Sequence, residues 1–152
     1  MEHIEFNCIF CAIAAQRAPA AVVYESDGAL AFLDIRPIVK GHTLVIPKKH
    51  SRNLFDLDDA SGASVMHASR VVARALRAAF NADGLTVLQS SERAGGQQVF
   101  HYHQHLAPRF IGDGLMSRNA NEAQLHWRVH GNPTREALQA LAEKIRAQIK
   151  ED

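Results

Sequence analysis

Short apolar stretches bounded by turn-forming residues dominate the first part of the chain. Val22–Glu25 and Ala29–Asp34 have the length of strands and are separated by the turn signal Ser26-Asp27-Gly28, so together they predict a β-hairpin. His42–Pro47 is rich in β-branched residues and predicts a third strand. Leu85–Gln89 predicts a fourth by the same criterion.

Two longer stretches repeat apolar residues at helical spacing. The first runs from about Asp58 to Phe80 and predicts a long helix ending at the turn signal 81–84, with an apolar face of Val65, Ala68, Val72, Leu76 and Ala79. The second begins at Asn132-Pro133, where Asn can cap a helix and Pro fits its first turn, and its apolar face holds Leu138, Leu141, Ile145 and Ile149. A short helix is also expected at about residues 8–16, before Ala18-Pro19.

The order of these elements predicts the fold class. Strands interrupted by one long helix are typical of an α+β fold with a mainly antiparallel sheet. At 152 residues the chain has the length of a single domain and can bury a substantial core. We therefore expect one domain over residues 1–152, with an irregular stretch between Gly112 and Gly131 that contains the only tryptophan, Trp127.

The stretch Gln97–Phe110 carries the most distinctive chemistry. His101, His103 and His105 alternate, and because side chains in a strand alternate between faces, they are expected in one row with steps of about 7 Å. The opposite face would be apolar, although Gln104 interrupts it, and would hold Phe100, Tyr102, Leu106 and Phe110. A row of imidazoles indicates a metal site, nucleophilic or acid–base catalysis, or a combination of these.

A pair of cysteines lies near the start, in Cys8-Ile9-Phe10-Cys11. Thioredoxin-like redox chemistry would place such a pair at the end of a strand, but only seven residues precede Cys8. The spacing favours half of a zinc site, which needs two more ligands from elsewhere in the chain.

Composition and charge exclude several classes of partner. A formal net charge of +1 argues against a broad surface for nucleic acid or membranes, so neither is expected as a partner. No apolar run approaches the ~20 residues that span a bilayer. The first residues lack the basic start and apolar core of a signal peptide, so we expect a cytoplasmic protein.

The loop before the histidines suits an anionic ligand. It runs from Ser90 to Gly96 and ends in paired glycines, which let the backbone approach a ligand closely, although a plain hairpin turn would also use them. Gln97 follows directly and could donate to a phosphate oxygen.

Taken together, these motifs resemble the histidine triad (HIT) family. The signature stands here as His101-Tyr102-His103-Gln104-His105-Leu106-Ala107, and similar blocks occur at 31–35, 41–50 and 96–100, with the cysteine pair at the start. The similar blocks extend from about residue 7 to residue 110. Within the family, the sequence most resembles the Hint-type nucleotide-binding hydrolases.

The resemblance implies an enzyme that cleaves nucleoside monophosphate conjugates, such as phosphoramidates, at the α-phosphate. His103 takes the position of the nucleophile, which forms a covalent nucleotidyl-histidine intermediate that water then hydrolyses. His105 and His42 would stabilise the phosphate and move a proton to the leaving group. Gln97 would orient the phosphate or the leaving group.

The resemblance also implies a nucleotide-binding set. Asp34 would accept hydrogen bonds from the ribose hydroxyls, and an apolar slot for the base, expected to be a purine, would be formed by Ile9, Phe10, Ile13, Phe32 and Ile35. Ser90 and Gln98 would face the phosphate, but relatives often have Asn at the first position and Ser or Thr at the second. These two departures affect the expected leaving group and rate rather than the nucleophile.

A structural zinc ion is implied by comparison with relatives that hold one on two cysteines and two histidines. The matching residues are Cys8, Cys11, His50 and His101, which would form a closed tetrahedral site. The competing possibility is a catalytic zinc on His101, His103 and His105, which would leave the cysteines unexplained.

Two other functions are compatible with the same motifs. One is a dinucleoside polyphosphate hydrolase with the same nucleophile, and the other is a nucleotide-binding regulatory module with little turnover. Relatives form homodimers through the long helix and a sheet edge, so a homodimer is expected.

Overall fold

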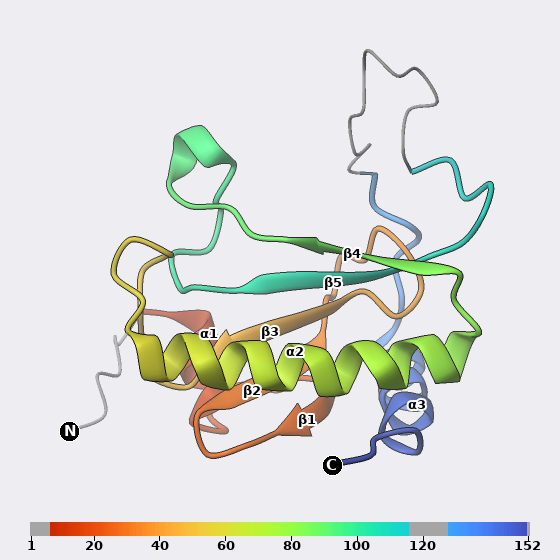
Figure 1. Cartoon of the computed structure of the whole chain (residues 1–152), viewed down its shortest axis with the longest axis horizontal. Helices are drawn as coiled ribbons and strands as arrows, with labels where there is room; N and C mark the ends of the chain where they lie inside the picture. The colour runs from red at the N-terminus through yellow and green to blue at the C-terminus, as the bar shows by residue number, and fades with distance from the viewer. Residues whose placement is uncertain (1–6, 116–127, 152) are drawn as a thin grey trace.

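The computed structural model describes residues 7–115 and 128–151. Its centre is a five-stranded antiparallel sheet with the order β1-β2-β3-β5-β4 (Figure 1). The strands are Val22–Glu25 (β1), Ala29–Leu33 (β2), Thr43–Pro47 (β3), Gly84–Leu88 (β4) and Gln104–Arg109 (β5). The helices are Ile9–Ala14 (α1), Asp59–Phe80 (α2) and Arg135–Arg146 (α3), with one 3₁₀ turn at Arg93–Gly95. The expected α+β fold is confirmed.

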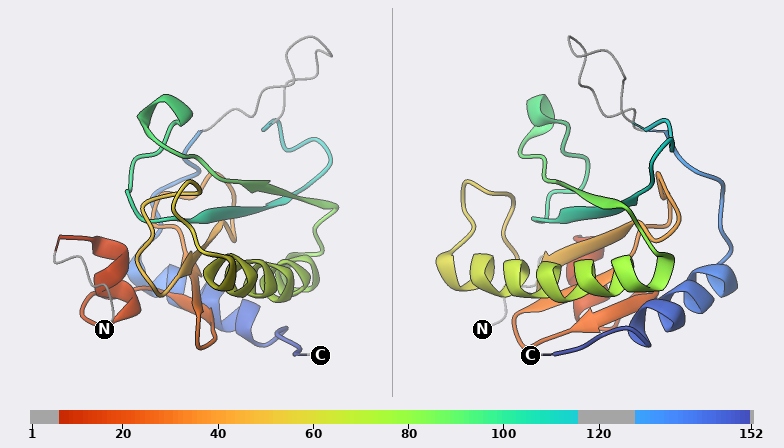
Figure 2. Two further views of the ribbon diagram at one scale, coloured as in Figure 1. Left: turned by 60° about the vertical axis from the view of Figure 1, so that its left-hand side comes forward. Right: turned by 45° about the vertical axis from the view of Figure 1, so that its right-hand side comes forward.

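The sheet is covered on both faces, which explains why β2 and β3 are buried at every position. Alternate residues of β2 and β3 form two separate clusters. One cluster, which includes Ala31 and Val45, packs against α2 and α3. The other, which includes Phe32 and Leu44, packs against Phe10 of α1. Accordingly, α1 lies on the opposite side of the sheet from α2 (Figure 2).

The long helix begins and ends as its sequence predicts. The Asp58 carboxylate caps α2 by accepting a 2.7 Å hydrogen bond from the Ser61 amide. At the other end Asn81 adopts a left-handed conformation, with φ 51°, which stops the helix. The buried positions of α2 include Val65, Ala68, Val72 and Leu76, so its apolar stripe faces the sheet.

Two boundaries differ from the sequence prediction for identifiable reasons. The C-terminal helix begins at Arg135 rather than at Asn132-Pro133, because the Thr134 hydroxyl accepts from the Ala137 amide and acts as the cap. The first helix ends at Ala14, two residues before the expected end, since Gln16 has φ 59°. Trp127 lies outside the described residues. Across the part of the chain that the structure describes, no helix combines the length and the apolarity needed to cross a bilayer.

Candidate functional site

The strand β5 brings its histidine to the sheet face that carries α1. His105 pairs with Leu44 of β3 on one side and Leu88 of β4 on the other, and paired residues of antiparallel strands point to the same face. Leu44 belongs to the cluster beneath α1. Gln104, which interrupts the apolar pattern in the sequence, faces α2 instead and accepts a 2.9 Å hydrogen bond from Ser69.

The expectation that all three histidines lie on one strand is wrong. The strand begins only at Gln104, because the preceding backbone has other partners. The Tyr102 amide donates to the Ser51 carbonyl at 2.6 Å, and the His101 carbonyl accepts from His103 Nδ1 at 2.7 Å. As a result the three histidines do not form one row. The His101 ring contacts the cysteines, whereas the rings of His103 and His105 lie side by side with their centroids 5.0 Å apart.

Hydrogen bonds set the tautomers of His42 and His105, the two histidines beside His103. The Ile38 backbone amide, which can only donate, lies 3.1 Å from His42 Nδ1, so in the neutral ring the proton is on Nε2. That Nε2–H faces His105 Nδ1 at 2.9 Å, which places the His105 proton on its own Nε2. The result is a directed chain of donors from Ile38 through His42 to His105.

The contact of His103 with the backbone assigns its tautomer in the same way. Its Nδ1 lies against the His101 carbonyl, which can only accept, so Nδ1 carries the proton and Nε2 carries the lone pair. His103 is buried, with 8% of the residue exposed, and its ring packs edge-on against Phe10 at 5.2 Å between centroids. The structure therefore presents one oriented imidazole lone pair next to a hydrogen-bond donor chain.

Burial keeps these rings neutral. Burial, aided by the neighbouring His103 ring, lowers the pKa of His42 to about 4. Burial together with the His103 and His42 rings lowers the pKa of His105 to about 3. Burial also lowers the pKa of His103. Near pH 7 the three rings are neutral, as the directed donor chain requires.

The lowered pKa of His42 makes folding stability depend on pH. Below about pH 6.5 the unfolded chain binds a proton that folded His42 does not accept until about pH 4. The free energy of unfolding should therefore fall as the pH drops through this window, by roughly 2–3 kcal/mol from His42 alone. Urea unfolding at pH 7 and pH 4.5 measures the change.

Replacing His42 isolates its contribution to the pH dependence of the free energy of unfolding. His42→Gln should reduce the pH dependence, whereas the same change at His67, an exposed residue of α2, should leave it unchanged. An equal pH dependence in the unmodified protein and the His42→Gln variant would show that His42 does not make this contribution.

Asp34 lies at the edge of the same site. Its Oδ2 atom is 3.6 Å from His42 Nε2, its Oδ1 atom accepts from the Arg36 amide at 2.8 Å, and its side chain is 15% exposed. The carboxylate thus remains accessible to a ligand that approaches the histidines. Asp34, His42 and His105 also place three ligand atoms within 4.8 Å of one another. Because His42 Nε2 holds a proton, this group is poorly suited to a metal.

Cys8, Cys11, His50 and His101 form a second cluster, in which the four ligand atoms all lie within 4.8 Å of one another. Cys11 Sγ lies 3.3 Å from His50 Nδ1 and 3.5 Å from His101 Nδ1, and the two Nδ1 atoms are 3.2 Å apart. Ideal zinc bond lengths give edges of about 3.6 Å between S and N and about 3.4 Å between two N atoms. The four residues therefore fit a zinc ion.

The protonation of His101 supports this fit. Its Nε2 donates to the Pro47 carbonyl at 2.8 Å, so Nδ1 carries a lone pair directed at the cysteines. Helix α1 supplies both thiols, since Cys8 caps its first turn and Cys11 lies within it. The competing site on the histidine row is not formed: among the described residues, His103 belongs to neither group of clustered ligand atoms.

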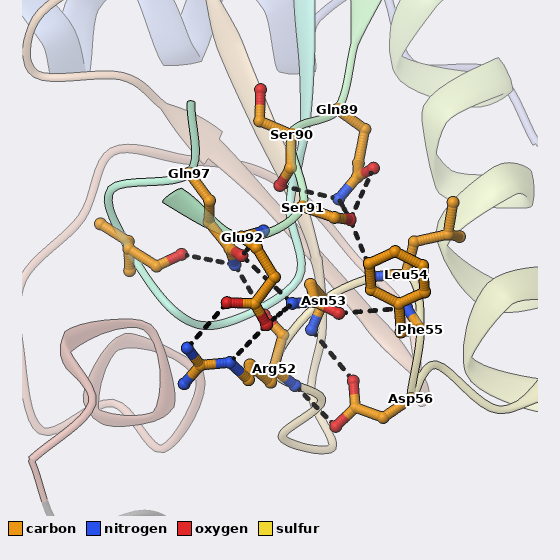
Figure 3. A network of polar contacts seen from close by, with 11 residues as sticks. Arg52, Asn53, Leu54, Phe55, Asp56, Gln89, Ser90, Ser91, Glu92 and Gln97 are labelled. Atoms are coloured by element: carbon orange, nitrogen blue, oxygen red, sulfur yellow. Dashed lines mark hydrogen bonds and ion pairs between the residues drawn. The ribbon is translucent and has the colours of Figure 1, made fainter. Parts of the chain in front are cut away.

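Gln97 is buried, and its carboxamide is fully used within the protein (Figure 3). Its Oε1 accepts from the Glu92 amide at 2.8 Å and from Asn53 Nδ2 at 3.3 Å. Its Nε2 donates to the Arg52 carbonyl at 2.7 Å and to the Val99 carbonyl at 3.0 Å. Two donors and two acceptors are all that a carboxamide offers. Arg52, Asn53 and Glu92 have no signal in the sequence that would have identified them.

The remaining sequence candidates divide by exposure. Phe10, Phe32 and Ile13 belong to the apolar cluster beneath α1. Ile9 and Ile35 are exposed, at 52% and 71%. Ser90 and Gln98 lie in the loop that joins β4 to β5, where Gln98 is exposed.

Comparison with known proteins decides the family. The family model described as "HIT domain" matches residues 15–112 of the chain. The chain belongs to the HIT family. This HIT protein is 47% identical over 114 residues to "Protein hit" of Bacillus subtilis, across 74% of this chain and 79% of that relative.

Solved structures agree in fold with this HIT protein. It is similar to a Hit-like protein from Bartonella henselae, described as involved in cell-cycle regulation and as holding an unknown ligand, with TM-score 0.81 and 40% identity over 95% of this chain and 98% of that one. It is also similar to a Zn-bound histidine triad family protein from Mycobacterium smegmatis, with TM-score 0.78 and 36% identity over 93% and 92% of the two chains. HIT proteins are generally nucleotide-binding hydrolases or transferases.

Proposed function

We propose that this HIT protein hydrolyses nucleoside monophosphate conjugates, such as phosphoramidates of a purine nucleotide, at the α-phosphate. The observation that carries the proposal is the His103 Nε2 lone pair beside the donor chain that ends at His105 Nε2–H. A neutral imidazole is both nucleophilic and a good leaving group, as a two-step transfer requires.

The chemistry balances in two steps. His103 Nε2 bonds to the α-phosphorus as the bond to the leaving group breaks, and the His105–His42 pair supplies the proton that the leaving group needs. Water then attacks the same phosphorus, the bond to His103 breaks, and the proton of the water returns to the pair. Asp34 would bind the ribose hydroxyls, and the slot lined by Ile9, Phe10, Ile13, Phe32 and Ile35 would hold the base, with Ser90 and Gln98 beside the phosphate.

Turnover of two substrates tests this assignment. The purified protein should hydrolyse an adenosine phosphoramidate faster than a dinucleoside polyphosphate when both are measured at equal concentration. Faster cleavage of the polyphosphate would assign the alternative hydrolase activity. Tight binding of adenosine monophosphate with no cleavage of either substrate would indicate a regulatory binding module.

We also propose that the four-residue cluster of Cys8, Cys11, His50 and His101 holds a structural zinc ion. When bound, zinc would join α1 to the segment that precedes β5 and would perform no chemistry, because all four positions of a closed site are taken by the protein.

We propose a homodimer, as the family resemblance implies, and place its interface at the β4 edge of the sheet and α2. Strand β4 is one of the two outer strands, and it exposes Leu85 and Val87 next to α2, where Met66 is also exposed. Light scattering at micromolar concentration should give twice the 16.8 kDa mass of one chain. Val87→Glu should shift the mass towards the monomer, whereas Val129→Glu, outside this surface, should not. A monomer mass for the unmodified protein would contradict the expectation.

A further inference from the structure

The loop that joins β4 to β5 begins beside the catalytic histidines. Strand β4 ends at Leu88, which pairs with His105, so the loop of residues 89–98 leaves the sheet beside His105. The chain then returns to the sheet through His101 and His103. Ser90 and Gln98, the two candidate phosphate-facing residues, belong to this loop. Their position relative to His103 therefore depends on the conformation that the loop adopts.

A closed ring of hydrogen bonds fastens this loop to the segment that follows β3 (Figure 3). The Arg52 guanidinium contacts the Glu92 carboxylate at 2.8 and 3.0 Å, and Asn53 Nδ2 donates to the same carboxylate at 2.7 Å. Gln97 closes the ring, since its carboxamide joins the Arg52 carbonyl to the Glu92 amide. The Arg52 guanidinium also lies 4.3 Å above the Phe100 ring.

The segment that anchors the loop is itself held in place. The Asp56 carboxylate accepts from the amides of Arg52 and Asn53, both at 3.0 Å. Asn53 is 1% exposed, and its Oδ1 accepts from the Phe55 amide at 3.1 Å. The Ser51 carbonyl accepts from the Tyr102 amide, which ties the same segment to the backbone between His101 and His103.

The backbone of Glu92 is strained. It has φ 61° and ψ 167°, a region that is essentially restricted to glycine and costs on the order of 1–3 kcal/mol for other residues. A glycine would adopt this conformation without strain, but it would lack the carboxylate that binds Arg52 and Asn53. Such strain persists only where the surrounding contacts over-determine the conformation. Here those contacts are the ring of hydrogen bonds.

We propose that Gln97 and Glu92 are positioning residues, which hold the 89–98 loop at the catalytic site through Arg52 and Asn53, and that the Gln97 carboxamide does not bind the phosphate itself. Protein groups occupy both donors and both acceptors of the carboxamide, so none is left for a phosphate oxygen. This inference rests on the proposed hydrolase function for its kinetic consequences but not for its geometry.

Solvent exchange tests the geometry without any substrate. In an ¹⁵N correlation spectrum, the side-chain NH₂ signals of Gln97, identified by their loss in Gln97→Glu, should be protected from exchange. Glu92→Ala removes an exposed carboxylate and should abolish that protection while the protein stays folded. Glu143→Ala, on the exposed surface of α3, is the matched control and should not. Rapid exchange of these signals in the unmodified protein would overturn the proposal.

A double-mutant cycle tests the catalytic role. Glu92→Ala and Gln97→Ala should each lower kcat/KM for the adenosine phosphoramidate by about 10- to 100-fold, mostly through kcat. The double variant should lose no more than the worse single variant, because both act through one ring. Glu92→Asp should restore part of the rate. Additive losses, with Gln97→Ala far worse than Glu92→Ala, would instead show direct contact of Gln97 with the substrate. If the unmodified protein shows no turnover, the proposed activity fails, and the exchange measurement still decides the geometry.

Discussion

His103→Ala should lower single-turnover hydrolysis of an adenosine phosphoramidate by at least about 10³-fold. The variant loses the Nε2 lone pair that the proposed first step requires, and no other ring replaces it. The His105 and His42 rings are committed to the donor chain, in which His42 Nε2 faces His105 Nδ1 at 2.9 Å. Rapid-quench kinetics measures the loss.

The covalent intermediate gives a second measurement on the same reaction. Mass spectrometry of the quenched unmodified protein should show a transient adduct of one nucleoside monophosphate, which His103→Ala should lack. His67→Ala, the same change at an exposed position of α2, should keep both turnover and adduct. Retention of the adduct in His103→Ala would assign the nucleophile to another residue.

Cys11→Ala should remove bound zinc and lower the free energy of unfolding by roughly 3–5 kcal/mol. Cys11 is the better cysteine to change, because its Sγ contacts both His50 and His101, whereas Cys8 also caps α1. The free energy of unfolding should change more than the free energy of nucleotide binding, since protein side chains would take all four positions on the metal. Metal analysis, thermal unfolding and titration with adenosine monophosphate measure the three quantities.

A chelator separates loss of metal from loss of the side chain. Chelation should lower the midpoint of thermal unfolding of the unmodified protein by about 10 °C and should leave that of Cys11→Ala unchanged. Less than about half an equivalent of zinc in protein purified without chelator would contradict the structural-zinc proposal.

The elements that could be predicted from the sequence are those whose own residues determine them. The apolar stripe and both end signals of α2 are local, so its prediction from Asp58 to Phe80 matches the helix within one residue. The sequence predicts too early a start for α3, because Asn132 and Thr134 are both acceptable caps and only the structure shows that Thr134 is used. The late start of β5 depends on the Ser51 carbonyl, which is remote in sequence from its partner Tyr102.

The site shows the same limit. Residue types and spacing, together with the family resemblance, were enough to separate Cys8, Cys11, His50 and His101 from the other histidines, and the structure brings these four together. The role of Gln97 could not be predicted, because its partners come from two loops that are distant in sequence. One of these loops also has a strained backbone conformation at Glu92. No local pattern in the sequence encodes either property.

His101 contacts the cysteines, whereas His105 contacts His42, so the number of residues between them is fixed by two separate clusters. Gln104 is bonded to Ser69 on the α2 face, while its neighbour His105 points to the opposite face, and β3 and β4 pair with this strand on both sides. One additional residue after His101 would either turn the His105 ring into the core or move His101 away from the cysteines. Insertions and deletions between residues 101 and 105 should therefore disrupt one of the two clusters.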